Sequence, residues 1–203
     1  MGVTIHFRGR LNDKSQVHEL MREVQDICDS MNWEYDLIDE DWSIKTNLQI
    51  RHFRETGLEL SGHAGLKGIF FKPHPNCSII PLTFNRAGIL VDFLSLIAGY
   101  EDDEEDLPWV FTKTQYAGPE THAAVINFLR YIKKKYISDL EVEDEGEYWT
   151  TGDISIVTNR IRKLESAMDM IEAGISRMKV EDLTELSEEE LFLKIQEIVQ
   201  EFD

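Results

Sequence analysis

Acidic side chains gather at two places where an expected strand is followed by a tryptophan. Residues 39–41 (Asp-Glu-Asp) precede Trp42, and the acidic string at residues 143–147 precedes Trp149. Two carboxylates can act as a general acid and base, or can hold a divalent cation. Both strings are polar and turn-like, a setting in which runs of acids are usually solvated. We therefore interpret them as the exposed ends of two related strands.

His74 is the candidate for acid–base catalysis. It could work with Asp144 or Glu145 in a hydrolase, where one group activates water. Cys77 lies three positions further on in HPNC, but a closed zinc site needs four ligands and this pair supplies two. The sequence offers no third group to orient a Cys–His pair for nucleophilic attack. It thus predicts no metal and no cofactor, and it ranks catalysis below binding.

Basic and amide side chains follow the strands expected near residues 3–11 and 109–115. Hydrophobic and polar residues alternate in VTIHFRGRL, so His6, Arg8 and Arg10 share its polar face. If the first strands of both segments are central in one sheet, these groups meet on an open face that suits a small anion or an acidic peptide. The alternative is scattered, solvated side chains that make local pairs. The candidate ligand-binding residues are Arg8, Arg10, Lys72, His74, Lys113 and Gln115.

Two segments share the order strand, helix, strand. In residues 1–42, the strand at 3–11 precedes a helix with apolar residues at helical spacing and a strand at 33–38. In residues 109–149, proline at the first helical turn follows the strand at 109–115, and a strand begins at Leu140. A hairpin is expected at 65–84. The sequence therefore predicts residues 1–150 to be an α+β core, a ferredoxin-like layered sheet from two related β-α-β units.

The C-terminal segment, residues 151–203, has a different pattern. Apolar residues recur at alternating spacings of three and four from Ile154 to Met178, which is a heptad repeat. A shorter amphipathic helix is expected to begin at Ser187, where SEEE forms a capping box. The two helices could form a hairpin, pack on their own core or pair with another chain. We expect self-association through residues 154–202.

The charge of the chain is strongly acidic. Its 203 residues carry a formal net charge of −18, and 19 acidic against 6 basic side chains lie in residues 139–203. Such a field repels nucleic acid, whose binding depends on clustered lysine and arginine. No run of 18 apolar residues and no signal-peptide pattern occurs, so we expect a cytoplasmic protein without a membrane partner. An acidic surface could also neutralise a basic protein partner.

Several strings resemble a group of uncharacterised bacterial proteins of similar length. The likeness rests on FTKTQYAG, FLRYIKKKY and LEVEDEGEYW within Phe111–Asp153, and on RGRL, DEDW and GLKGI earlier in the chain. It spans most of residues 1–153. The resemblance implies a bacterial cytoplasmic protein and supplies no activity, cofactor or site residue.

The sequence favours a non-catalytic binding or assembly protein. An acidic immunity or antitoxin-like protein that neutralises a basic partner is the first alternative. A hydrolase that uses His74 with Asp144 or Glu145 is the second alternative.

Overall fold

The computed structural model describes residues 3–53, 57–97 and 107–177, and the chain divides into the units Gly2–Val157 and Thr158–Asp203. The strands are β1 (Thr4–Arg8), β2 (Glu34–Asp39), β3 (Gln49–Phe53), β4 (Gly57–Ser61), β5 (Lys67–Lys72), β6 (Ile80–Phe84), β7 (Val110–Lys113) and β8 (Glu141–Asp144). The helices are α1 (Val17–Met31), α2 (Phe93–Ile97), α3 (Gly118–Lys135), α4 (Tyr148–Thr151) and α5 (Ile154–Arg177).

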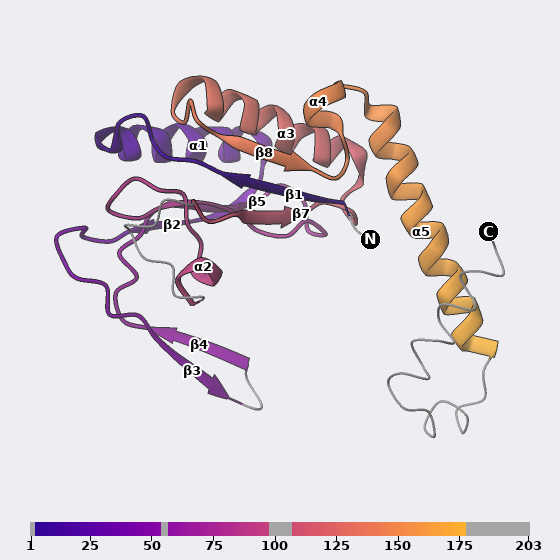
Figure 1. The fold of residues 1–203 in the computed structure, drawn as a ribbon, viewed down its shortest axis with the longest axis horizontal. Helices are drawn as coiled ribbons and strands as arrows, with labels where there is room; N and C mark the ends of the chain where they lie inside the picture. Colours follow the sequence, from indigo (N-terminus) through magenta and orange to yellow (C-terminus); the bar gives the residue numbers. More distant parts are fainter. Residues whose placement is uncertain (1–2, 54–56, 98–106, 178–203) are drawn as a thin grey trace. The chain divides into compact units, whose positions relative to one another are not determined.

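Two three-stranded antiparallel sheets form the centre of the first unit. One has the order β7-β1-β8 and the other the order β2-β5-β6, while β3 and β4 form a separate pair. β6 contacts β7. Just before β6, the Ser78 amide donates to the Lys113 carbonyl at 2.9 Å. Helices α1 and α3 lie on the same side of the strands (Figure 1). The predicted α+β class is therefore confirmed.

One hydrophobic core joins both sheets to α1 and α3. Alternation along β1 turns Ile5 and Phe7 inward, where both are fully buried, as predicted. They belong to one cluster with Phe71 of β5 and Leu129 of α3. A second, smaller cluster around Leu66 covers the other face of β5, where Phe70 stacks on Phe93. β5 and β6 are thus largely buried on both faces, whereas β2 is mostly exposed.

The strand pairing differs from the predicted ferredoxin-like arrangement. β1 and β2 lie in separate sheets, so residues 1–42 do not form a β-α-β unit within one sheet. β7 and β8 flank β1, and both pair with it in antiparallel fashion. The strand pairing therefore does not show the proposed duplication. Side-chain alternation identifies a strand and its buried face, but it does not identify the strand's neighbour.

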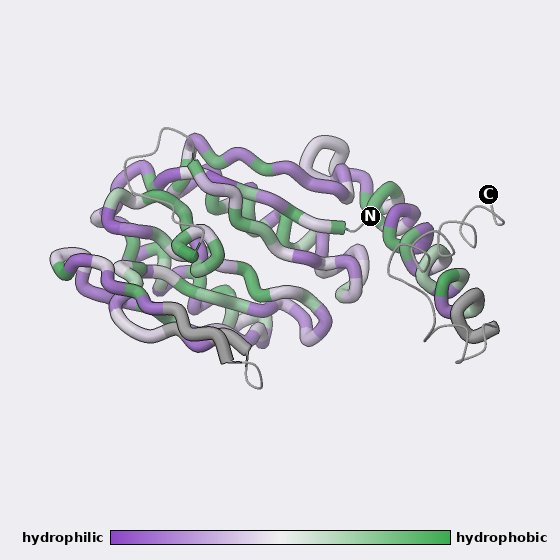
Figure 2. The backbone as a smooth tube through the Cα atoms, turned by 60° about the horizontal axis from the view of Figure 1, so that its bottom comes forward, coloured by the Kyte–Doolittle hydropathy of each residue, from purple (hydrophilic) through white to green (hydrophobic). Residues whose placement is uncertain are grey.

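The C-terminal segment begins with the predicted heptad helix. α5 runs continuously from Ile154 to Arg177, and hydrophobic and hydrophilic residues alternate along it (Figure 2). The second expected helix, starting at Ser187, lies outside the described residues. No described helix is long and apolar enough to cross a membrane.

Candidate functional site

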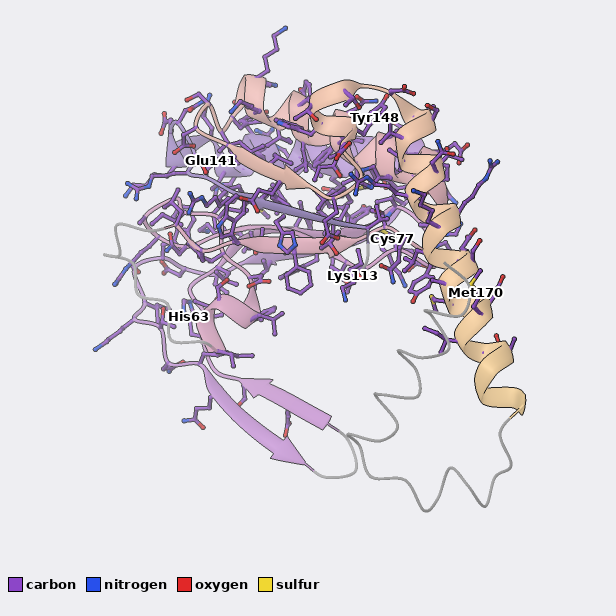
Figure 3. All side chains as sticks on the ribbon, turned by 45° about the vertical axis from the view of Figure 1, so that its right-hand side comes forward. His63, Cys77, Lys113, Glu141, Tyr148 and Met170 are labelled. Atoms are coloured by element: carbon purple, nitrogen blue, oxygen red, sulfur yellow. The ribbon has the colours of Figure 1, made fainter. Side chains whose placement is uncertain are left out.

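The face of the β7-β1-β8 sheet away from the helices carries part of the predicted basic surface. Strand register places Lys113 opposite Thr4, and Phe111 opposite His6. The His6 and Phe111 rings lie 5.8 Å apart, centroid to centroid. Lys113 is exposed on this face (Figure 3), and its ammonium forms no ion pair with a described residue. The predicted meeting of β1 and β7 side chains on one face does occur.

Acids from β8 lie on this same face. Register places Glu143 opposite His6 and Glu141 opposite Arg8. The Arg8 guanidinium binds the Glu141 carboxylate at 2.8 Å and stacks on the Trp109 ring, 4.5 Å from its centroid. These acids were not predicted to lie here, because side-chain alternation does not show that β8 pairs with β1. The face is consequently of mixed charge.

The other predicted ligand-binding residues make local contacts or belong to the second sheet. The Gln115 side-chain oxygen accepts the Val3 amide at 3.1 Å, which ties the start of β1 to the end of β7. His74 Nδ1 accepts the Asn76 amide at 3.1 Å within a turn. Arg10 is exposed just beyond β1, and Lys72 ends β5 opposite Glu34. These groups are therefore not shown to converge with Arg8 and Lys113.

Asp144 forms a buried cluster with His122 and Thr114. The imidazole Nε2 of His122 lies 2.9 Å from the Asp144 carboxylate, and its Nδ1 lies 2.7 Å from the Thr114 hydroxyl. His122 Nε2 makes no aligned hydrogen bond with a described group, so its approach to Asp144 is a close polar contact. Asp144 also accepts the backbone amides of Gly146 at 2.7 Å and Trp149 at 2.8 Å. One carboxylate thus joins β8, α3 and the turn that enters α4.

The ionisation of Asp144 depends on these neighbours. Burial favours the neutral acid, but His122 and the two backbone amides hold the pKa of Asp144 below its ordinary value. Glycine is required at position 146, because a Cβ there would lie 2.6 Å from His122 Nε2. The cluster is therefore closely packed around one buried carboxylate.

A hydroxyl, an imidazole and a carboxylate are also the groups of a nucleophilic triad. Here, however, Thr114 and His122 are both 0% exposed, so a substrate cannot approach the hydroxyl. His74 makes no hydrogen bond or ion pair with Asp144 or Glu145 among the described residues. The contacts of these residues favour a structural role over catalysis.

His122 could have been found from the sequence. It lies on the apolar stripe of α3 with Val125, Ile126 and Leu129, all of which are fully buried. A histidine on such a stripe needs a polar partner inside the protein. The sequence does not identify that partner, because Asp144 is 22 positions away along the chain.

The first acidic string also binds nearby backbone and basic groups. Glu40 accepts the amides of Ala64 at 3.3 Å and Leu66 at 2.9 Å. Asp39 forms an ion pair with Lys67, and its carboxylate lies 3.1 Å from His18 Nε2. The hydrogen bond from Lys67 is the main cause that lowers the pKa of Asp39. In both acidic strings, carboxylates at the end of a strand thus bind nearby backbone amides and basic side chains.

Neither cysteine has the surroundings of a reactive thiol. Cys77 is buried, its sulfur lies 3.9 Å from the Thr112 hydroxyl, and burial raises its pKa. Burial also raises the pKa of Cys28 to about 11. A nucleophilic thiol needs a lowered pKa. Within residues 3–53, 57–97 and 107–177, no three His, Cys, Asp or Glu side chains are grouped to hold a metal ion.

Glu23 of α1 binds three side chains of the α3 region. Its carboxylate accepts hydrogen bonds from the Tyr131 and Tyr136 hydroxyls and from the Lys135 ammonium. Partial burial opposes ionisation, but these hydrogen bonds lower the pKa of Glu23 to about 2. These hydrogen bonds connect α1 to α3, the two helices that cover the sheets.

Replacing Glu23 with glutamine should remove part of the stability that exists above pH 4.5. The pKa of Glu23 falls from an ordinary value of 4.5 to about 2 on folding, so its charge stabilises the fold above pH 4.5 and this stabilisation is lost as the pH falls toward 2. Urea denaturation at pH 7 and pH 3 checks this. The difference in free energy of unfolding between wild type and Glu23→Gln should be smaller at pH 3 than at pH 7. An equal difference at both pH values would contradict a lowered pKa of Glu23 in the folded protein.

The apolar stripe of α5 is a further candidate surface. Leu164 and Ile171 are partly buried, while Glu165, Ser166 and Glu172 between them or beside them are exposed. Two apolar positions seven residues apart fall on one side of a helix, whereas Ser166 falls on the other. The predicted heptad stripe is thus present as one face of the helix.

Comparisons of the chain with models of protein families, with curated proteins and with solved structures found no match. The resemblance to a bacterial group therefore stays a prediction.

Proposed function

We propose that this protein is a non-catalytic binding or assembly protein of the bacterial cytoplasm that self-associates through α5. The observation that carries this proposal is the heptad stripe on a continuous helix, Ile154–Arg177. A heptad repeat keeps apolar residues on one seam, and such seams pair with the seam of another helix. The burial of Thr114, His122 and both cysteines supports a role in binding over one in nucleophilic catalysis.

Charged substitutions in the apolar stripe of α5 test the proposed self-association. Replacing Leu164 and Ile171 with glutamate should dissociate the assembly, because burial of each such side chain contributes about 1.5–3 kcal/mol. Loss of both should weaken association more than about a hundredfold. Sedimentation velocity of the full chain over a range of concentrations measures the change.

A matched control places the same charges on the opposite side of α5. Ser166 and Ala173 are exposed, and their replacement with glutamate should leave the assembly intact. A wild-type chain that is monomeric at every concentration, or equal effects of both double variants, would overturn the proposal. Far-UV circular dichroism verifies that each variant remains folded.

The same proposal includes a ligand on the open face of the β7-β1-β8 sheet. An exposed Lys113 beside the His6 and Phe111 rings supports binding of a small anion or an acidic peptide. The pairing of Arg8 with Glu141 reduces the positive charge available there. Residues 1–42 and 109–149 share the order strand, helix, strand. Their helices α1 and α3 lie on the same side of the strands (Figure 1), and both observations support the proposed duplication.

A further inference from the structure

β2 is an edge strand whose outer side has no pairing strand among the described residues. It pairs with β5 on its inner side only, over Glu34–Asp39. The Glu40 amide continues this ladder by donating to the Leu66 carbonyl at 3.0 Å. Because alternate residues of an antiparallel ladder bond to the partner strand, Tyr35, Leu37 and Asp39 direct their backbone groups outward. These residues present a row of backbone donors and acceptors.

The side chains on β2 combine negative charge with one exposed apolar group. Asp36 is exposed and forms no ion pair or hydrogen bond with a described residue, and Glu34 is exposed opposite Lys72. Leu37 is 49% exposed on the other face of the strand. Acids on an edge strand discourage pairing with a second copy of the same strand, since like charges on neighbouring strands repel.

The same acids would favour a strand of opposite charge. Two adjacent strands place side chains within reach of each other, and opposite charges across the pair are favourable. A cationic side chain of the added strand could form an ion pair with the Asp36 carboxylate. An apolar side chain beside Leu37 would cover the exposed surface of that leucine. The backbone groups of Tyr35, Leu37 and Asp39 would supply the hydrogen bonds.

We propose that β2 is the docking edge for an extended, basic segment of a partner protein, which adds to the β2-β5-β6 sheet as a fourth strand. The inference goes beyond assembly through α5 and does not depend on it, because it rests on a different element. The partner segment is expected to be extended and to alternate basic and apolar residues.

A synthetic peptide tests this inference on the full chain. The probe is a ten-residue peptide that alternates lysine and valine, and the control is the same peptide methylated on its backbone nitrogens. Amide NMR signals of the protein report where each peptide binds. The unmethylated peptide should shift the Tyr35, Leu37 and Asp39 signals and slow their hydrogen exchange, and added salt should weaken its binding.

Charge reversal at Asp36 provides the matched variant. Asp36→Lys should weaken binding about tenfold, because one attractive pair becomes repulsive. Glu172→Lys changes the net charge equally at an exposed position of α5 and should have no effect. Leu37→Pro should also abolish binding, since it removes an outward amide without altering the charge, and proline is tolerated on an edge strand.

Four results would overturn the inference. The methylated peptide could bind as tightly as the unmethylated one, which would show an electrostatic contact without strand addition. The shifted signals could lie outside β2, or Asp36→Lys and Glu172→Lys could weaken binding equally. A lack of binding to the folded wild-type chain at millimolar peptide would have the same meaning.

Discussion

Replacing Asp144 with alanine should lower the free energy of unfolding by about 3–5 kcal/mol, because it removes a buried carboxylate on which several polar groups depend. The carboxylate is 1% exposed and lies 2.9 Å from His122 Nε2. Its loss also leaves the amides of Gly146 and Trp149 without their acceptor. Unpaired buried polar groups add to the cost. Urea denaturation at pH 7 measures the effect.

Glu143 provides the control because it neighbours Asp144 on β8 but is exposed. Glu143→Ala should change the stability by less than about 0.5 kcal/mol. Similar losses for both variants would contradict the buried contact. The double variant with His122→Ala should lose less than the sum of the single variants, because each single substitution leaves the other group unpaired.

The pH dependence of the Asp144 variant has a definite sign. The pKa of Asp144 in the folded protein lies below its ordinary value of 3.8. Its charge therefore stabilises the fold above about pH 3.8, and this stabilisation is lost as the pH falls through the lower, folded-state pKa. The stability gap between wild type and Asp144→Ala should accordingly narrow in acid.

This cluster shows why the sequence predicted the elements better than the site. The strand before Asp144 and the helix containing His122 were both expected, and both occur as β8 and α3. Their meeting depends on which strand flanks β1, and side-chain periodicity carries no information on that choice. Asp144 was consequently considered with His74, whereas its partner is His122.

The local patterns that succeeded have strong short-range causes. Proline at position 119 lies in the first turn of α3, as expected from its fixed φ and missing donor. The 65–84 hairpin occurs as β5 and β6. The pair β3–β4 was not predicted, and the apolar run at 89–100 could not be assigned from periodicity; its described part contains the short helix α2.

Gly68 should be the position in the second sheet least tolerant of a side chain. It lies in β5 with φ of 152°, opposite Thr83 of β6. A Cβ there would meet the Leu82 carbonyl oxygen at 2.2 Å and Thr83 Cα at 2.6 Å. Both contacts are backbone atoms of the paired strand, so relief requires the strands to separate. Gly68→Ala should therefore cost about 3 kcal/mol or more, from overpacking together with backbone strain.

A substitution at Gly152 distinguishes backbone strain from overpacking. It also has a positive φ, 66°, but no atom lies within 4 Å of the position that a Cβ would occupy. Gly152→Ala should cost only the backbone term, about 1–2 kcal/mol. Thermal unfolding of both variants provides the comparison. A clearly larger loss for Gly68→Ala assigns the difference to the close approach of β5 and β6, whereas equal losses would mean that the strands can move apart at little cost.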